Sequence, residues 1–170
     1  MIKRRTFLIL VGIISLSLIY GQSGTSDNIT DFIKKAYLGN LMQIKCGNLA
    51  MKNAKDGGVR SFGSQMIADH SQINEQLHLL VQTKNYNIRA RDTSGKSIDK
   101  LLKKASPTGF DNFYISKMVT EDKELVALYQ NALTINDPGI QNFVKSTLPV
   151  LKGHLSSAIA MANRLNIQTH

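Results

Sequence analysis

The sequence predicts an all-α protein in which four amphipathic helices form an up-down bundle. Three observations support this fold class. Apolar residues recur every three or four positions in four long segments, which is the spacing that places side chains on one helix face. Short breaks containing Gly or Pro separate the segments within each half of the chain. A much longer connection separates the two halves, and 170 residues suffice for one such domain.

The segment of residues 59–81 shows the pattern most clearly. Its predicted inner face is apolar and consists of Val59, Phe62, Met66, Ile73, Leu77 and Leu80. His70 lies in the middle of this face, at a position where a core residue is expected. A histidine at such a position indicates either a buried, hydrogen-bonded ring or a ligand.

Each of the other three helices has the same arrangement, an apolar face interrupted by one polar side chain. We expect these helices over residues 29–55, 110–135 and 139–165. Ser26 or Asp27 is suited to cap the first of them. The interrupting residues are Gln43 in the first helix, Asp122 in the third and His154 in the fourth.

The breaks between segments determine how the helices are connected. Asp56-Gly57-Gly58 and Asn136-Asp137-Pro138-Gly139 are short turns, so each joins two antiparallel neighbours. Residues 86–108 are long enough, at about 3.3 Å per residue, to return along the full length of a bundle. We therefore predict a long crossover between helices two and three, which is the ferritin-like arrangement of a four-helix bundle.

The N-terminus has the features of a secretion signal. A basic start precedes an apolar run over residues 7–20, which is short for a membrane span. We expect residues 1–21 to be a signal peptide cleaved near Gly21, with an uncleaved anchor as the alternative. Residues 22–28 are then a flexible leader, and residues 29–166 form the bundle domain. The protein is expected to be exported, to the periplasm, the outer membrane or the medium.

Charge and cysteine content narrow the classes of partner. The formal net charge is +9, but the Lys and Arg residues are scattered and the chain has no Trp on which bases could stack. We therefore expect no nucleic-acid partner. A moderately basic surface suits anionic envelope components or another protein. Cys46 is the single cysteine, so no internal disulfide can form.

The four polar interruptions are predicted to share one level of the bundle. Gln43 and His70 each lie about 18 Å from the first short turn, at 1.5 Å per residue. Asp122 and His154 lie at distances from the second turn that agree to within about one helical turn. Two imidazoles, a carboxylate and an amide could then bind a transition metal such as copper, iron or zinc. Two methionines one turn away would favour a copper-like ion.

The alternative interpretation of the same residues is a structural polar network without metal. Buried histidines are most often satisfied by a hydrogen bond, and His70 with Gln43 and Asp122 with His154 would make suitable pairs. The Glu-x-x-His motif of di-iron bundles is absent, because an apolar residue stands three positions before each of the two histidines.

Several short motifs are distributed over the predicted helices. The most specific are Met66-x2-Asp69-His70 and Leu148-Pro149-x4-His154-Leu155, and Phe110-Asp111-x2-Tyr114 and Gly47-Asn48-Leu49-Ala50 accompany them. With these motifs, residues 31–165 resemble a bacterial family of exported ferritin-like proteins classed as a domain of unknown function. The resemblance implies the fold and the export and leaves the activity open. Members of that family usually have a glutamate where this chain has Gln43 and a histidine where it has Asp122, so the ligand set of any family metal site is altered here.

Three functions remain as hypotheses. The first is a non-enzymatic envelope protein that has a binding or stress-related role through its surface. The second is a metal-binding protein with His70, Asp122, His154 and Gln43 as ligands, and the third is a metal-dependent redox enzyme at the same residues. The sequence has no Gly-rich phosphate loop, nucleophile elbow or HExxH helix, so it predicts no catalytic residue and favours the first hypothesis.

Overall fold

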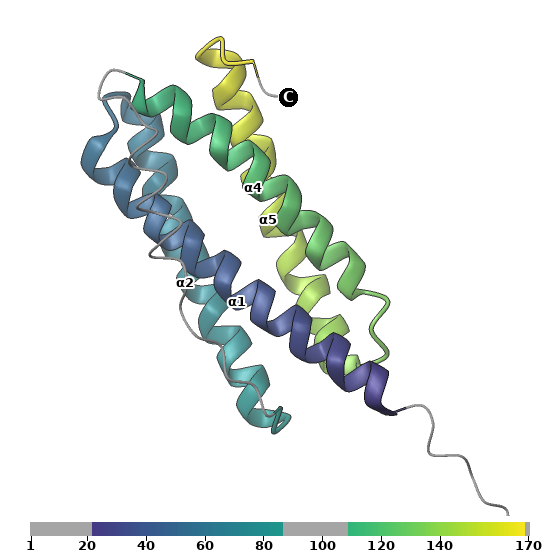
Figure 1. Ribbon diagram of the computed structural model, residues 1–170. Helices are drawn as coiled ribbons and strands as arrows, with labels where there is room; N and C mark the ends of the chain where they lie inside the picture. The colour runs from purple at the N-terminus through teal and green to yellow at the C-terminus, as the bar shows by residue number, and fades with distance from the viewer. Residues whose placement is uncertain (1–21, 87–108, 169–170) are drawn as a thin grey trace, which may run out of the picture.

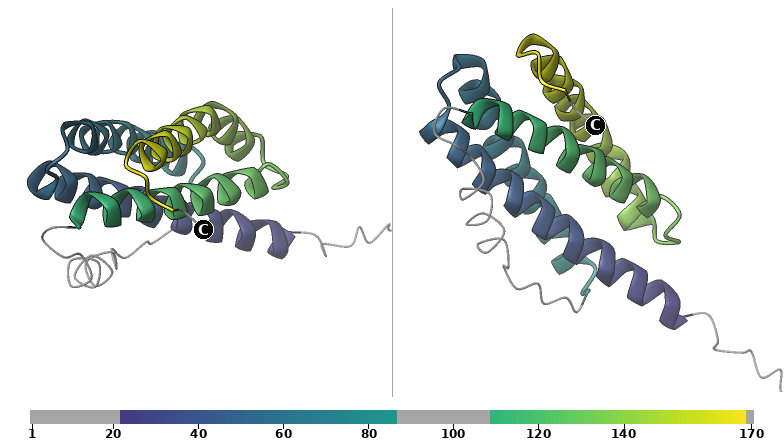
Figure 2. Two further views of the ribbon diagram at one scale, coloured as in Figure 1. Left: turned by 90° about the horizontal axis from the view of Figure 1, so that it is seen from above. Right: turned by 45° about the horizontal axis from the view of Figure 1, so that its top comes forward.

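The computed structural model describes residues 22–86 and 109–168, and these residues form a four-helix bundle (Figure 1). The helices are α1 (Gln22–Asn53), α2 (Gly57–Thr83), α4 (Phe110–Ala132) and α5 (Pro138–Arg164). Helices α1 and α5 each pack against both α2 and α4. Seen from above, the bundle has two layers, α1 with α4 and α2 with α5 (Figure 2). The predicted all-α bundle is thereby confirmed.

Hydrogen bonds at one end of the bundle fix the order of the helices. The Asp111 carboxylate, in the first turn of α4, accepts hydrogen bonds from the backbone N–H groups of Lys55 and Asp56 in the α1–α2 turn. The Asp56 carboxylate pairs with Arg164 at the end of α5, at 2.7 Å. The start of α4 therefore lies beside the start of α2, while α2 ends at the opposite end of the bundle (Figure 1).

The end of α2 and the start of α4 therefore lie at opposite ends of the bundle. This placement is the one expected for the single long crossover that the length of residues 86–108 predicts. Residues 87–108 of the predicted crossover lie outside the described residues, as does the predicted signal peptide over residues 1–21. None of the helices in the described ranges is both long and apolar enough to cross a membrane.

Helix α1 begins at Gln22, so residues 22–28 are helical and do not form the predicted flexible leader. Neither Ser26 nor Asp27 is its N-cap, since both lie inside the helix. The leader was expected because Gly and Ser, which are frequent in this segment, have low helix propensity. Propensity is a weak guide here, because extending an existing helix by one residue adds a hydrogen bond without a new nucleation cost.

Two aspartates cap the helices that follow the short turns. Asp56 precedes α2 and accepts a hydrogen bond from the backbone N–H of Val59 at 3.0 Å. Asp137 precedes α5 and accepts one from the N–H of Ile140 at 2.9 Å, with Pro138 in the first helical position. Each carboxylate satisfies a backbone donor that has no partner within its helix. The turns are thus fixed by local chemistry that is readable in the sequence.

Helices α1 and α2 approach each other closely at two glycines. A Cβ atom built on Gly47 would lie 2.5 Å from the carbonyl oxygen of Gly63, and one on Gly63 would lie 2.7 Å from the Cβ of Ala50. These distances are shorter than van der Waals contact, so only glycine fits at either position. The contact sets the register of the α1–α2 hairpin, and with it the residues that face each other farther along the two helices.

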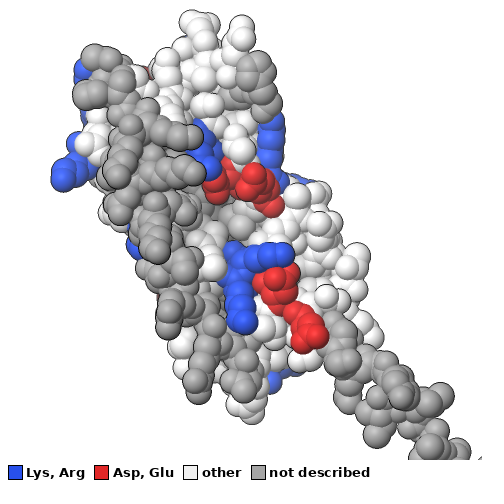
Figure 3. All heavy atoms as spheres, viewed as in Figure 1, with Lys and Arg blue, Asp and Glu red and all other residues white. Residues whose placement is uncertain are grey.

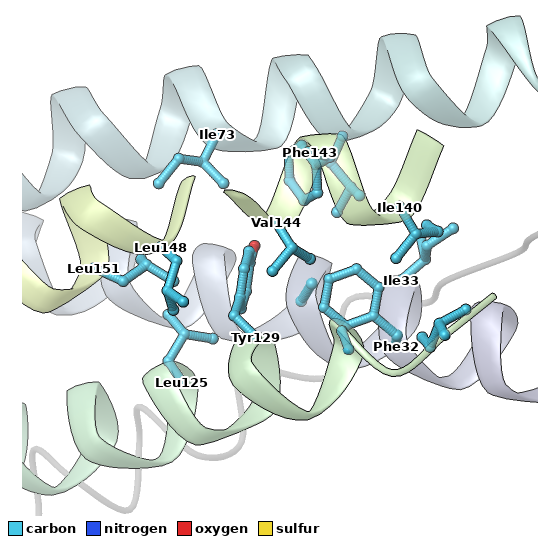
Figure 4. Close-up of a cluster of buried hydrophobic side chains, with 14 of the residues drawn as sticks. Phe32, Ile33, Ile73, Leu125, Tyr129, Ile140, Phe143, Val144, Leu148 and Leu151 are labelled. Carbon is cyan, nitrogen blue, oxygen red and sulfur yellow. The ribbon is translucent and has the colours of Figure 1, made fainter. Parts of the chain in front are cut away.

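The buried apolar side chains form two separate clusters, one toward each end of the bundle. The first cluster includes Phe32, Leu77, Tyr129 and Leu151 (Figure 4). The second lies nearer the α1–α2 turn and includes Cys46, Phe62, Met66, Tyr114 and Met118. On every helix the residues of the two clusters are separated by a buried polar position. The core is therefore divided at one level by polar side chains.

Candidate functional site

A layer of buried polar side chains lies between the two apolar clusters. We call it the polar layer, and it consists of Asn40 and Gln43 from α1, His70 from α2, Asp122 from α4 and His154 from α5. Each of these side chains is 2% exposed or less. Four of the five are the residues that interrupt the predicted apolar faces. Helical spacing therefore located them, because a side chain on the inner face is buried whatever its polarity.

Gln43 and Asp122 form the part of the polar layer that lies between α1 and α4. The Gln43 Nε2 donates a hydrogen bond of 2.7 Å to Oδ1 of Asp122. Burial, assisted by the negative charge of Glu121 and opposed by the hydrogen bond from Gln43, raises the pKa of Asp122 to about 7. The protonated form of this carboxyl is therefore favoured more than that of an exposed aspartate.

His70 and His154 form the other part, between α2 and α5. Their ring centroids are 5.0 Å apart. His70 Nδ1 is 2.9 Å from Oδ1 of Asn40, and His154 Nε2 is 2.8 Å from Oδ2 of Asp69. Burial and, to a smaller extent, repulsion from His154 together lower the pKa of His70 to about 3. The His70 ring is therefore neutral at physiological pH.

The hydrogen-bond partners determine which ring nitrogen of each histidine carries the proton. Asn40 uses its Nδ2 to donate to Oδ1 of Asn74 at 2.9 Å, so its Oδ1 faces His70 as an acceptor. His70 must then carry its proton on Nδ1. The Asp69 carboxylate can only accept, so His154 carries a proton on Nε2. When both rings are neutral, a lone pair remains on His70 Nε2 and on His154 Nδ1.

Neither of these two ring nitrogens has a hydrogen-bond partner. The same holds for the second oxygen of Asp122 and for the amide oxygen of Gln43. The buried side-chain atoms without a hydrogen bond include His70 Nε2, His154 Nδ1, Gln43 Oε1 and Asp122 Oδ2. The Gln43 amide donates through its nitrogen, so its free oxygen is an acceptor. The polar layer thus holds two nitrogen and two oxygen atoms that can accept a proton donor or a cation. Buried polar groups are normally paired, so four unpaired acceptors at one level require an explanation.

Two tyrosine hydroxyls lie near the polar layer, one from each apolar cluster. Burial raises the pKa of both Tyr114 and Tyr129, so each keeps its proton. The Tyr114 hydroxyl has no hydrogen-bond partner among the described residues, and the Tyr129 hydroxyl lies close to the Asn40 side chain. Figure 4 shows the Tyr129 hydroxyl directed across the bundle interior, away from the backbone of its own helix. Each hydroxyl keeps a proton that it can donate.

The pairs within the polar layer differ from those expected for a structural network. His70 is bonded to Asn40, and Gln43 to Asp122. His154 is bonded to Asp69, which we had not placed in the layer. The contact between Gly47 and Gly63 explains the first difference. Asn40 lies about two turns before Gly47, and His70 about two turns after Gly63, so these two face each other.

Asn40 and Asp69 are the residues that sequence reasoning missed. Asn40 lies four positions after Ala36 and three before Gln43, so the spacing of the α1 face already included it. No periodic signal existed for Asp69. Its side chain is 32% exposed and reaches His154 on the neighbouring helix from the edge of the α2 face. Only the packing of α2 against α5 reveals that contact.

The polar layer has donor atoms suited to a metal ion, but it does not form a ready-made metal cage. Among residues 22–86 and 109–168, no group of three or more His, Cys, Asp and Glu side chains is arranged to hold a metal ion. The layer instead contains two pairs, His70 with His154 and Gln43 with Asp122. In the described part of the chain no hydrogen bond joins one pair to the other.

Most of the sequence matches one known protein family. Residues 20–161 match a family described as a domain of unknown function, DUF4142. The chain belongs to the DUF4142 family. All residues of the polar layer lie within the matched part of this DUF4142 chain. No curated protein and no solved structure matches it. The family description names no activity, so a function for this DUF4142 domain has to be argued from its geometry.

Proposed function

We propose that this DUF4142 protein is an exported, non-enzymatic bundle that binds one transition-metal ion in its polar layer. His70 and His154 supply nitrogen ligands, and Asp122 and Gln43 supply oxygen ligands. The observation that carries the proposal is the set of four unpartnered acceptor atoms on these side chains. When Asp122 is ionised and both imidazoles are neutral, these atoms are all acceptors, and a cation is their natural complement.

The free-energy cost of unpaired buried acceptors favours a bound ion or water molecule in the polar layer. Leaving a buried acceptor unpaired costs about 1–3 kcal/mol, and four such atoms lie at one level. One metal ion would satisfy all four acceptor atoms. The hydrogen bonds that these side chains already make use their other polar atoms and leave these four unpaired. A water molecule donating to two of the acceptors is the competing occupant, and it corresponds to the structural network.

The histidines are also prepared as ligands by the groups behind them. A ligating imidazole usually donates its second N–H to a carboxylate or carbonyl oxygen, which fixes the ring orientation and the tautomer. Asp69 has this position behind His154, and Asn40 has it behind His70. Two neutral imidazoles and one carboxylate are a donor set that suits zinc, copper or iron.

Binding requires the two pairs to come together around one ion. In the described structure the ring centroids of His70 and His154 are already 5.0 Å apart, with the rings tilted by 45°, so the adjustment falls on Asp122 and Gln43. Rotation of the Asp122 side chain away from Gln43 would direct its carboxylate to the interior of the bundle. That step exchanges the hydrogen bond of 2.7 Å for a metal–oxygen bond.

Element analysis of protein purified from its own envelope without chelators tests the metal site. We expect close to one equivalent of a transition metal in the wild type and its loss in His70→Gln and His154→Gln. His78→Gln is the matched control, because His78 is exposed and contacts Gln82 outside the polar layer. Metal that is absent from the wild type, or retained in both histidine variants, would identify the layer as a structural network.

A second measurement covers variants that fold poorly. Adding Zn²⁺ or Cu²⁺ to the metal-free wild type should raise its melting temperature, because a ligand at a hundredfold excess over its Kd stabilises the folded state by about 2.7 kcal/mol. Asp122→Asn should reduce the shift while keeping the fold, since asparagine can still accept the hydrogen bond from Gln43. No shift for the wild type with any of the metals would also count against the site.

The export part of the proposal is supported by the basic and apolar residues at the N-terminus. N-terminal sequencing of the mature protein from fractionated cells tests it directly. We expect the mature chain to begin near Gln22 and to be absent from the cytoplasmic fraction. A full-length chain in the cytoplasm would exclude export, and a full-length chain in the membrane fraction would indicate the uncleaved anchor.

A further inference from the structure

A cleft on the surface between α1 and α4 leads to the polar layer. Its volume is about 230 Å³, and its lining consists of Lys35, Gly39, Gln43, Glu121, Glu124, Leu125 and Leu128. Both helices face the viewer in Figure 1, and the space-filling view of the same side shows carboxylates intermixed with lysines over this part of the surface (Figure 3). The cleft therefore joins charged surface groups to a residue of the buried layer.

Gln43 is the residue that the cleft and the polar layer share. Its side chain lines the cleft although it is only 2% exposed, and its Oε1 has no hydrogen-bond partner. Its Nε2 is bonded to Asp122, so the amide connects the lining of the cleft to the buried carboxylate. Gln43 is the one lining residue that also belongs to the polar layer, so a cation entering the cleft would reach the layer at this side chain.

The charges at the cleft favour a cation. Lys35 is paired with Asp31 and Glu121 with Lys117, whereas Glu124 forms no ion pair within the described residues. Glu124 is exposed, and Glu121, which also lines the cleft, is adjacent to Asp122 in sequence. Glu124 thus offers an unpaired carboxylate at the rim, and Glu121, which Lys117 holds, places a second carboxylate next to the buried Asp122.

We propose that this cleft is the access path by which a divalent cation reaches the polar layer, with Glu124 and Glu121 as capture residues and Gln43 as the inner gate. The proposal rests on the proposed metal-binding function and adds how the ion arrives. The cation first exchanges water for the carboxylates at the rim. It then passes to Gln43 Oε1, and rotation of the amide releases Asp122 to become a ligand.

Gly39 keeps the cleft open. A Cβ atom at this position would lie 2.9 Å from Cδ1 of Leu125, which is the end of a flexible side chain. A larger side chain is therefore tolerated by the fold but occupies the cleft. Gly153 on α5 is a matched position without such a neighbour, because a Cβ there would meet no atom within 4 Å.

Stopped-flow absorbance with Co²⁺, a coloured substitute for Zn²⁺, measures loading of the metal-free protein. We expect the double variant Glu121→Gln/Glu124→Gln to load about tenfold more slowly than the wild type at low salt, with the same final stoichiometry. The difference should shrink at about 1 M salt, where the Debye length is only about 3 Å. Glu75→Gln, which removes one exposed carboxylate from α2, is the control for charge.

Gly39→Leu tests the path by obstruction, with Gly153→Leu as its control. We expect slower loading for the first and an unchanged rate for the second. Normal stoichiometry with wild-type rates in both the acidic double variant and Gly39→Leu would overturn the access path and leave the metal site intact. Absence of Co²⁺ binding by the wild type at equilibrium would overturn the metal site itself, and the path with it.

Discussion

Asn40 and His70 are joined by a hydrogen bond of 2.9 Å inside the bundle, with the amide oxygen of Asn40 as the acceptor and Nδ1 of the imidazole as the donor. Because Asn74 holds the Asn40 amide in this orientation, the tautomer of His70 is fixed by two side chains from two helices. The consequence is a lone pair on Nε2 in a buried position without a partner. The properties expected of the polar layer follow from this relationship and its counterpart between Asp69 and His154.

The first prediction concerns these tautomers. Nitrogen NMR of the metal-free protein should show the proton of His70 on Nδ1 and that of His154 on Nε2. Asn40→Leu should release His70 from this constraint and weaken metal binding by about 10- to 100-fold, as is typical when a group behind a ligand is lost. The opposite tautomer for His70 in the wild type would remove the basis for its role as a ligand.

The second prediction concerns the pH dependence contributed by Asp122. Its pKa is about 7 in the folded protein and lies near 3.8 when the chain is unfolded, so between these values the folded state holds a proton that the unfolded state has lost. The contribution of this group to the free energy of unfolding therefore falls as the pH rises toward 7. Asp122→Asn removes that dependence.

Denaturant unfolding of metal-free protein measures this effect. The stability of Asp122→Asn relative to the wild type should increase by about 2 kcal/mol between about pH 5 and pH 8. His70 has a depressed pKa and destabilises the fold below about pH 6.5, but it does so in both proteins and cancels in the comparison. Glu75→Gln on the exposed side of α2 should show no such trend. A constant difference across this range would mean that Asp122 ionises normally in the fold.

The third prediction compares two glycines within helices. Gly63→Ala should destabilise the protein by about 1–3 kcal/mol, because the added Cβ would lie 2.9 Å from the carbonyl oxygen of Gly47 and force α1 and α2 apart. Gly153→Ala should stabilise it by about 0.5–1 kcal/mol, because the new methyl group meets no atom and alanine favours the helix. The melting temperatures of the two variants, compared with that of the wild type, test both expectations. Equal effects would show that the helices do not pack through Gly63.

The fourth prediction tests the start of α5. Asp137→Ala should cost about 0.5–2 kcal/mol, because the N–H of Ile140 loses its acceptor at the helix N-terminus. Asp137→Asn should retain most of the stability, since asparagine is an equally good N-cap residue. Urea unfolding midpoints give the comparison. If both substitutions are equally costly, the charge of Asp137 and not its hydrogen bond is the stabilising feature.

The sequence was sufficient for the number, order and inner faces of the helices. Helical spacing placed Gln43, His70, Asp122 and His154 on inner faces, and the structure buries all four. Spacing works because it follows from helix geometry, which does not depend on what the neighbouring helix contributes. The same independence explains why the long crossover could be predicted from the length of residues 86–108 alone.

The sequence was insufficient for the contacts within the polar layer. Which residue faces His70 depends on the register of α1 against α2, and a backbone contact between Gly47 and Gly63 sets that register. A shift of about one turn separates the expected partner Gln43 from the observed partner Asn40. The helical start at Gln22 was missed for a different reason, since Gly and Ser content describes local preference and not the helix to which the residues are attached.

The placement of the polar layer between two apolar clusters bears on how solvent exchanges with the protein interior. Helix ends open first in native proteins, and such fraying leaves the middle of a bundle untouched. Amide hydrogens around His70 and Asp122 should then exchange only when one whole cluster unfolds as a cooperative unit, at a free energy between fraying and complete unfolding. A chemical group in the middle is thereby shielded from fraying at both ends, and the cleft between α1 and α4 leads to it from solvent in the folded protein.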